Sequence, residues 1–270
     1  MPDRDPVRSM FATHNNYVRC IASNLNGFEL TTTLQPTATL PIEKIDKFLK
    51  LSEMTHNSIR DEIEACFHDS DYTQVVAPWM PVKCYYRLYY LESVMLYLLS
   101  GSAVGFTHGG HMGVRKNIKS YVVSGQLTAS NSVILQSATV RDALAHTIPS
   151  GTNLSPNFHI TTDCIDSLKK KLAIYAEHDF REKNGIKDYR SQASRLKRDS
   201  FRATNNINLS DFFYWMRIKA NYKDVDYLDF ASDISPDDAY MYIMRYAAAQ
   251  ESYAFALETL IKELRVARGM

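Results

Sequence analysis

The stretch from Val82 to Gly101 constrains the fold more than any other part of the sequence. It reads VKCYYRLYYLESVMLYLLSG. Apolar residues fall on nearly every side of a helix built from this stretch, and Gly101 supplies a helix stop. A helix that is apolar all round has to be covered by other helices. The sequence therefore predicts a helical bundle with this segment in its interior.

A second helix is predicted just before this segment. From Pro41 onward, apolar residues recur at spacings of three and four, with Lys and Glu at the positions between them. The apolar positions are Ile42, Ile45, Leu49, Ile59, Ile63 and Cys66. This pattern predicts one amphipathic helix, followed by a turn at residues 68–71.

Further helices are predicted after the glycine-rich break at 101–113. A short helix is expected over 114–123, and a longer one begins at the capping pair Thr162 and Asp163 and runs toward Arg181. Two more are expected around 209–222 and from Ser235 onward. The last begins with Ser-Pro-Asp-Asp, a capping-box pattern with proline at the first helical position.

Residues 1–40 are rich in Thr, Asn and Pro, and a weak alternation over 28–34 resembles a short strand. We expect a loosely structured N-terminal arm there, followed by one helical domain over 41–270. With 31 Lys and Arg against 30 Asp and Glu, the overall charge favours no strongly charged partner. The longest apolar run is too short to cross a membrane.

The cysteines and histidines predict neither a metal site nor a cofactor. The four cysteines form no Cys-x-x-Cys pair, which excludes a zinc ribbon and a disulfide framework and favours a reducing, cytoplasmic location. His108 and His111 lie three residues apart, but no third or fourth zinc ligand accompanies them. A glycine turn leading into a helix explains that segment.

Three motifs, in order, carry a resemblance to a known family. The Tyr-Tyr-rich run over 83–99 resembles the second helix of HEPN bundles (higher eukaryotes and prokaryotes nucleotide-binding). The segment THGGHMGVRKNIKSYVVSGQL over 107–127 is similar to their short His-Gly-Val helix. Arg-Ile-Lys-Ala-Asn-Tyr over 217–222 resembles the Arg-x-x-Ala-Asp-Tyr segment before their fourth helix, with Asn in place of Asp.

The resemblance implies an all-α, HEPN-like bundle of four to five helices. Its core would span 42–125 and 209–265, with a helical, basic insertion over about 126–208. Many members of the family are metal-independent ribonucleases that act as toxins or defence components, so an RNA-cleaving or RNA-binding homodimer, with an antitoxin or other partner protein, is implied. The alternatives are a non-catalytic interaction module and a nucleotide-sensing module.

The family's nuclease motif is Arg-x(4 to 6)-His, and residues 141–146 match it. By this resemblance, Arg141 would hold the scissile phosphate and stabilise the charge of the transition state. His146 would move a proton to or from the ribose hydroxyl. Asp142 would orient the imidazole, although a capping box with Thr139 explains Asp142 equally well. The alternative is that residues 141–146 match the motif by chance and form the solvent-exposed start of a helix.

Two further segments are candidates for nucleic-acid contact. Between Lys183 and Arg202 there are seven Lys or Arg and only two acids, so this stretch could follow an RNA backbone or be a solvated face. Tyr189 and Phe201 are available there for base stacking. Arg217 and Tyr222 could hold a phosphate, or Arg217 could bond Asp224 or Asp226 inside the bundle. The basic candidates are Lys187, Arg190, Arg195, Lys197 and Arg198.

Overall fold

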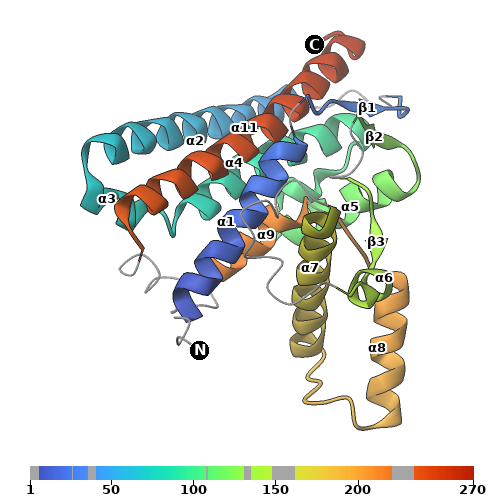
Figure 1. Ribbon diagram of the computed structural model, residues 1–270. Coiled ribbons are helices and arrows are strands. Elements are labelled where there is room, and N and C mark those ends of the chain that lie inside the picture. Colours follow the sequence, from blue (N-terminus) through green and yellow to red (C-terminus); the bar gives the residue numbers. More distant parts are fainter. Residues whose placement is uncertain are drawn as a thin grey trace.

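A computed structural model describes residues 6–25, 27–35, 41–107, 109–130, 135–147, 162–208, 210–220 and 234–270. Helices dominate these residues, as predicted, and the strands are short (Figure 1). In chain order the elements are α1 (Pro6–Asn24), β1 (Leu30–Thr32), α2 (Ile42–His68), α3 (Ser70–Val76), α4 (Met80–Ser100), η1 (Ala103–Phe106), α5 (His111–Val123), β2 (Leu127–Ala129), β3 (Ala138–Thr139), α6 (Val140–Ala145), α7 (Thr162–Lys183), α8 (Gln192–Thr204), β4 (Asn206–Ile207), α9 (Asp211–Ile218) and α11 (Pro236–Ala267).

Helix α4 lies in the interior of the main bundle, where α2, α11, α9 and α5 pack against it. Its tyrosines and aliphatic residues are buried on most of its faces, as the sequence predicted. Two charged residues are buried among them, and each has partners on α11. Arg87 forms ion pairs with Glu251 and Glu258, and Glu92 accepts a hydrogen bond from the Tyr253 hydroxyl at 3.1 Å. The bundle core is therefore apolar, and the ion pairs of Arg87 and the Tyr253–Glu92 hydrogen bond fix α4 against α11.

Local signals explain where several helices begin and end. Gly101 ends α4 in the left-handed conformation, with φ of 71°. Ser235 caps α11, because its side chain accepts a hydrogen bond from the backbone N–H of Asp238 at 3.2 Å. The turn expected at 68–71 is instead a helix cap, in which the Asp69 side chain accepts hydrogen bonds from the backbone of Asp71 and Tyr72.

The N-terminal segment corrects one prediction. Residues 1–40 were expected to form a loosely structured arm, but α1 is a helix that packs against α11 and α7 (Figure 1). Tyr17, Ile21 and Leu25, spaced four residues apart, are buried. The Tyr17 hydroxyl shares a hydrogen bond with Ser167 of α7 at 3.0 Å. Asn and Thr are weak helix formers, so burial of this apolar stripe is what holds the helix.

Two small antiparallel strand pairs join distant parts of the chain. Strand β1 pairs with β2, with Leu30 opposite Ala129, so the weak alternation near 28–34 does form a short strand. Strand β3 pairs with β4, with Ala138 opposite Ile207, and this pairing holds the start of α6 beside the end of α8. No described helix is long and apolar enough to cross a membrane.

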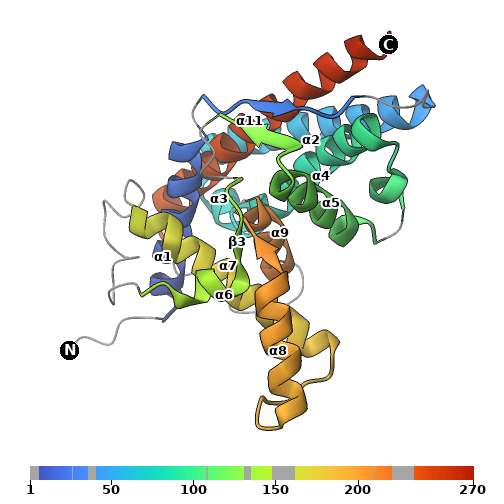
Figure 2. The same ribbon diagram turned by 90° about the vertical axis from the view of Figure 1, so that its right-hand side faces the viewer.

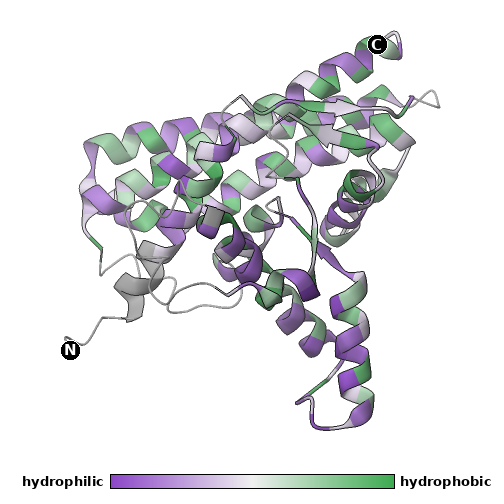
Figure 3. Cartoon of the chain, turned by 45° about the vertical axis from the view of Figure 1, so that its right-hand side comes forward, coloured by the Kyte–Doolittle hydropathy of each residue, from purple (hydrophilic) through white to green (hydrophobic). Residues whose placement is uncertain are grey.

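Helices α7 and α8 project from the main bundle as a hairpin (Figures 1 and 2). They lie in the segment expected to be a helical, basic insertion. The first half of α7 is anchored by buried residues, namely Cys164, Leu168, Leu172 and Ala173. In contrast, α8 has no buried residue. Figure 3 shows much of the projecting hairpin as hydrophilic.

Candidate functional site

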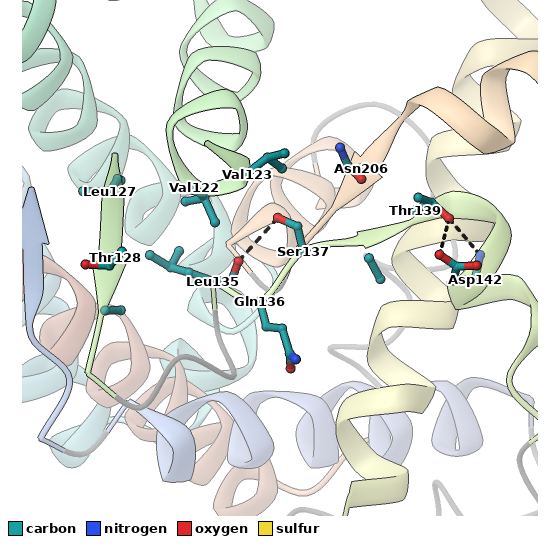
Figure 4. Close-up of a pocket in the computed structure, with 12 residues that line it drawn as sticks. Val122, Val123, Leu127, Thr128, Leu135, Gln136, Ser137, Thr139, Asp142 and Asn206 are labelled. Atoms are coloured by element: carbon teal, nitrogen blue, oxygen red, sulfur yellow. Dashed lines mark hydrogen bonds between the residues drawn. The ribbon is translucent and has the colours of Figure 1, made fainter. Parts of the chain in front are cut away.

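Asp142 and Thr139 form the capping box that was one of the two explanations for Asp142. The Thr139 hydroxyl accepts a hydrogen bond from the Asp142 backbone N–H at 3.0 Å and donates one to the Asp142 carboxylate at 2.7 Å (Figure 4). The side chain of Thr139 therefore satisfies a backbone donor at the start of α6. The Asp142 carboxylate is committed to this cap.

Arg141 and His146 contact different helices. The Arg141 guanidinium donates to the backbone carbonyl of Asp199 on α8 at 3.3 Å. The His146 Nδ1 lies 3.6 Å from the carboxylate of Asp166 on α7. Helix α6 ends at Ala145, and His146 has a non-helical backbone with ψ of 128°. Arg141 lies within α6 and His146 lies just after its end, so the two residues do not share one continuous helix, and their catalytic role stays a prediction.

Arg217 is an internal residue of the bundle, only 7% exposed. Its guanidinium donates to the Tyr86 hydroxyl at 3.1 Å and lies over the rings of Tyr85 and Tyr86, at 5.3 and 5.2 Å from their centroids. Arginine over aromatic faces gains cation–π energy in a desolvated setting. Tyr222 and the two acids considered as partners, Asp224 and Asp226, lie outside the described residues.

His111 belongs to the same cluster, which the sequence interpretation did not connect with Arg217. Its Nδ1 lies 2.8 Å from the Tyr85 hydroxyl, and its ring centroid is 4.1 Å from that of Tyr89. Burial lowers the pKa of His111 to about 4, and the charge of Arg217 adds to the effect. The imidazole is thus neutral at neutral pH. Among the described residues no group of three metal-ligating side chains comes together; His108 is outside them.

The basic hairpin, defined as α7, α8 and their connection over 184–191, carries the predicted nucleic-acid-binding residues other than Arg217 and Tyr222. Some of its cations have partners: Arg198 lies beside Asp199 at 3.0 Å, and Arg190 is 3.7 Å from Asp188. Arg202 forms a bidentate pair with Glu177. Across the residues that the structure describes, no ion pair involves the exposed side chains of Lys187, Arg195 and Lys197.

The two aromatic residues expected to stack on bases have partners within the hairpin. Phe201 stacks on Phe180, with the ring centroids 4.2 Å apart and the planes 17° apart. The guanidinium of Arg198 lies 5.0 Å from the ring centroid of Tyr189. These contacts stabilise the hairpin internally, so charge rather than stacking is what the hairpin presents to a ligand.

A second group of buried charges was missed by the sequence interpretation. Arg115 and Lys119, one helical turn apart on α5, both contact the carboxylate of Asp211 at the start of α9. Burial alone would raise the pKa of Asp211, but the two cations outweigh it and hold that pKa below its usual value. The i, i+4 spacing of the cations was visible in the sequence. Their distant partner was not.

A pocket beside α6 has the wrong chemistry for a phosphate. It has a volume of about 470 Å³, and apolar and neutral polar residues line most of it (Figure 4). Among the described residues that line it, Asp142 is the one charged side chain, and it would repel an anion. This pocket therefore does not extend the candidate site formed by Arg141 and His146.

Searches of protein-family models, curated proteins and solved structures find no match to this chain. The resemblance to HEPN bundles thus rests on the motifs of the sequence, and the function has to be argued from the geometry and charge described above.

Proposed function

We propose that this chain is a HEPN-like, RNA-binding protein whose basic hairpin contacts the phosphate backbone. One observation carries the proposal: Lys187, Arg195 and Lys197 are exposed on a projecting hairpin without an ion-pair partner in the described part of the chain. The net charge of the whole chain is only +1, so this concentration of cations is local.

Phosphate binding is the interaction that such a surface supports best. Each cation that neutralises an RNA phosphate releases a condensed counterion, so affinity depends steeply on salt. The two aromatic rings of the hairpin are already engaged with Phe180 and Arg198. We therefore expect binding that depends on charge and shows little base preference.

The HEPN-like bundle is supported by the order of elements around α4. The Tyr-rich helix is interior, the His-Gly-Val segment forms α5 after a glycine-rich break, and Arg217 lies near the end of α9, before the long α11. Homodimerisation and binding of an antitoxin or other partner protein are part of the same proposal.

The binding test is fluorescence anisotropy with a labelled single-stranded RNA at several salt concentrations. We expect the double variant Arg195→Glu/Lys197→Glu to weaken binding at least tenfold, with a salt slope shallower by roughly one to two. The control is Lys44→Glu/Lys47→Glu, which reverses two exposed cations on α2. Equal affinity of the two double variants would contradict RNA binding through the hairpin.

Cleavage at Arg141 and His146 is proposed as the catalytic extension of this binding. In support, Arg141 touches α8, the helix that also carries Arg195, Lys197 and Arg198. The test is incubation of mixed cellular RNA with purified protein in EDTA, comparing wild type, His146→Ala and Arg217→Ala at matched dimer content. Metal-independent cleavage that only His146→Ala abolishes would support this site.

A non-catalytic helical interaction module is the second candidate. The observation that favours it is the direction of the two side chains of the motif, Arg141 toward α8 and His146 toward α7. In that case no variant cleaves RNA in EDTA although all remain folded, and the salt-dependent binding by the hairpin is retained.

A further inference from the structure

Cys20 of α1 and Cys164 of α7 are far apart in the sequence, but their side chains meet inside the molecule. Both residues are completely buried, and all four cysteines of the chain are free thiols. The Cys164 thiol forms a hydrogen bond with the thiol of Cys20. One turn away on each helix, the Tyr17 hydroxyl shares a hydrogen bond with Ser167 at 3.0 Å, so α1 and α7 are in close contact here. Two thiols that touch across such a contact can form a disulfide with little movement of the backbone.

A second observation places both thiols in one cluster. Burial raises the pKa of the Tyr17 hydroxyl to about 12, the hydrogen bond with Ser167 opposes this, and the nearby thiols of Cys164 and Cys20 add to the rise. The other two cysteines have no such neighbour. Burial raises the pKa of Cys66 and of Cys84 as well, but no thiol contributes to either shift. The contact between thiols is therefore specific to Cys20 and Cys164.

The surroundings of the two sulfur atoms differ. The side-chain amide of Asn24 donates to the backbone carbonyl of Cys20 at 2.8 Å and also lies 3.9 Å from the Cys20 sulfur. A donor beside a sulfur stabilises the thiolate, which is the reactive form of cysteine. The hydrogen bond with Cys20 and burial instead raise the pKa of the Cys164 thiol. We therefore expect Cys20 to react first and Cys164 to react second.

Both cysteines lie near helix ends, which gives a small reagent a route to them. Cys164 is in the first turn of α7, and Cys20 is one turn from the end of α1 at Asn24. The Asn24 side chain is itself partly exposed. Helix ends open locally far more often than helix interiors. A reagent as small as hydrogen peroxide can reach the pair through such openings, at a rate below that of an exposed cysteine.

We infer that Cys20 and Cys164 are a redox-sensitive pair, which a peroxide converts into a disulfide between α1 and α7. In the first step the Cys20 sulfur attacks a peroxide oxygen and the O–O bond breaks, so that a sulfenic acid forms on Cys20 and the thiol proton leaves in a water molecule. In the second step the Cys164 sulfur attacks the Cys20 sulfur, and the S–O bond breaks. The hydroxyl leaves with the Cys164 proton as a second water. The two sulfurs lose two electrons in total, and the peroxide is reduced.

The disulfide would fix the element that depends most on tertiary contacts. Helix α1 is rich in weak helix formers and is held by its contacts with α11 and α7. A covalent link to α7 keeps α1 in place and also restricts the unfolded chain, which stabilises the folded state. The inference does not depend on RNA binding or cleavage, because it requires only the two thiols.

The test counts free thiols in wild-type protein, so it needs no substitution. Folded protein is treated with a small excess of hydrogen peroxide, denatured and alkylated with N-ethylmaleimide, and its mass is measured. We expect four labels before oxidation and two afterwards, because the chain has four cysteines and two of them become linked. Reduction before alkylation should restore all four. Peptide mapping should identify the link as Cys20–Cys164.

Single variants test the order of the two steps. In Cys164→Ala the second thiol is missing, so peroxide should leave a sulfenic acid on Cys20 that dimedone traps. Cys20→Ala should form neither a disulfide nor a dimedone adduct. The matched control is Cys66→Ala, which removes another buried cysteine and should form the Cys20–Cys164 disulfide like wild type.

Thermal unfolding measures the effect of the link on stability. Oxidation should raise the Tm of wild type by roughly 5–15 °C, and a reductant should reverse the rise. The Tm of Cys20→Ala should not respond to peroxide. The inference is overturned if all four thiols stay free after peroxide, if the link joins other cysteines or two chains, or if oxidised and reduced wild type unfold at the same temperature.

Discussion

Helices α4 and α8 are regular helices of the same chain that are used in opposite ways. Nearly every side of α4 is buried in the main bundle, whereas α8 buries no residue completely. Burial of apolar area is the main stabilising contribution of α4. Helix α8 packs against α6 and α7 through contacts that include the Phe180–Phe201 stack and the Arg202–Glu177 pair, and most of its other side chains are exposed.

This difference indicates how substitutions should act in the two regions. In the bundle, each change alters packing or leaves a buried charge unpaired, so the free energy of unfolding should fall. On α8, which has no buried residue, the same changes should leave stability nearly intact and act on ligand binding instead. Matched substitutions of one residue type in the two regions can break or sharpen this comparison.

The largest effect is expected for buried charge. Asp211→Asn leaves Arg115 and Lys119 without their buried carboxylate, which should cost about 3–5 kcal/mol of unfolding free energy. Asp199→Asn on α8 removes an exposed carboxylate and should change it by less than about 0.5 kcal/mol. Urea denaturation measures both. Similar losses in the two variants would show that the charge cluster does not stabilise the bundle.

Matched leucines test the apolar part of the comparison. Leu91 on α4 is 1% exposed, and Leu196 on α8 is 63% exposed. Leu91→Ala should cost about 2–5 kcal/mol, because it removes buried contacts and leaves a cavity. Leu196→Ala should stay within about 0.5 kcal/mol. If Leu91→Ala and Leu196→Ala shift the midpoint of urea unfolding equally, α4 and α8 do not differ in how much apolar burial stabilises them.

The pH dependence sharpens the description of the bundle interior. Burial raises the pKa of Glu92 to about 7 from its ordinary 4.5, although the hydrogen bond from Tyr253 and the charge of Arg115 oppose this. The folded state therefore binds more protons than the unfolded state between pH 4.5 and 7. This contribution to stability is present at acid pH and is lost as the pH rises toward 7.

Glu92→Gln should remove that pH dependence. At pH 8 the variant should be more stable than wild type, by on the order of 3 kcal/mol at most, and the gain should vanish near pH 4.5. Thermal unfolding between pH 4.5 and 8 measures it, with the exposed Glu43→Gln as control. Burial lowers the pKa of His14 to about 3, so below pH 6.5 this residue makes the free energy of unfolding rise with pH. It does so equally in wild type and in Glu92→Gln, and therefore cancels from their difference. If the difference in stability between Glu92→Gln and wild type were the same at every pH, Glu92 would not titrate in this range.

The smallest effect is expected for the ion pair that holds the hairpin together. Arg202 donates hydrogen bonds from Nε and Nη2 to the carboxylate of Glu177, and both side chains are partly exposed. A double-mutant cycle with Arg202→Ala and Glu177→Ala should give a coupling energy of about 0.2–1 kcal/mol, smaller at high salt. A coupling of several kcal/mol would mean that the hairpin is a cooperative part of the bundle.

Local signals in the sequence were sufficient for the main bundle. The apolar period over 42–66, the apolar segment ending at Gly101 and the cap at Ser235 all correspond to observed helices. Helix α1 was missed because its Asn and Thr residues resemble a loop, and only contacts with α11 and α7 compensate for their low helix propensity.

The sites were harder to predict, because their residues are far apart in the chain. Arg115 and Asp211 are separated by 96 positions, and no local pattern links them. For Arg141 and His146 the difficulty was local. The Arg-x(4 to 6)-His pattern does not show where a helix ends, whereas α6 ends at Ala145 and the two side chains contact different helices. Helix α6 has only six residues, which is too short for its apolar periodicity to show in the sequence where it ends.

The pairing of α4 with α11 also has a consequence during synthesis on the ribosome. Arg87 of α4 binds Glu251 of α11, 164 positions further along the chain. At a translation rate of roughly 5–20 residues per second, the face of α4 that α11 will cover stays exposed for on the order of ten seconds or more. During that time α4 is a natural target for chaperones that hold apolar segments. Ribosome-stalled chains that end before Pro236 should bind them persistently.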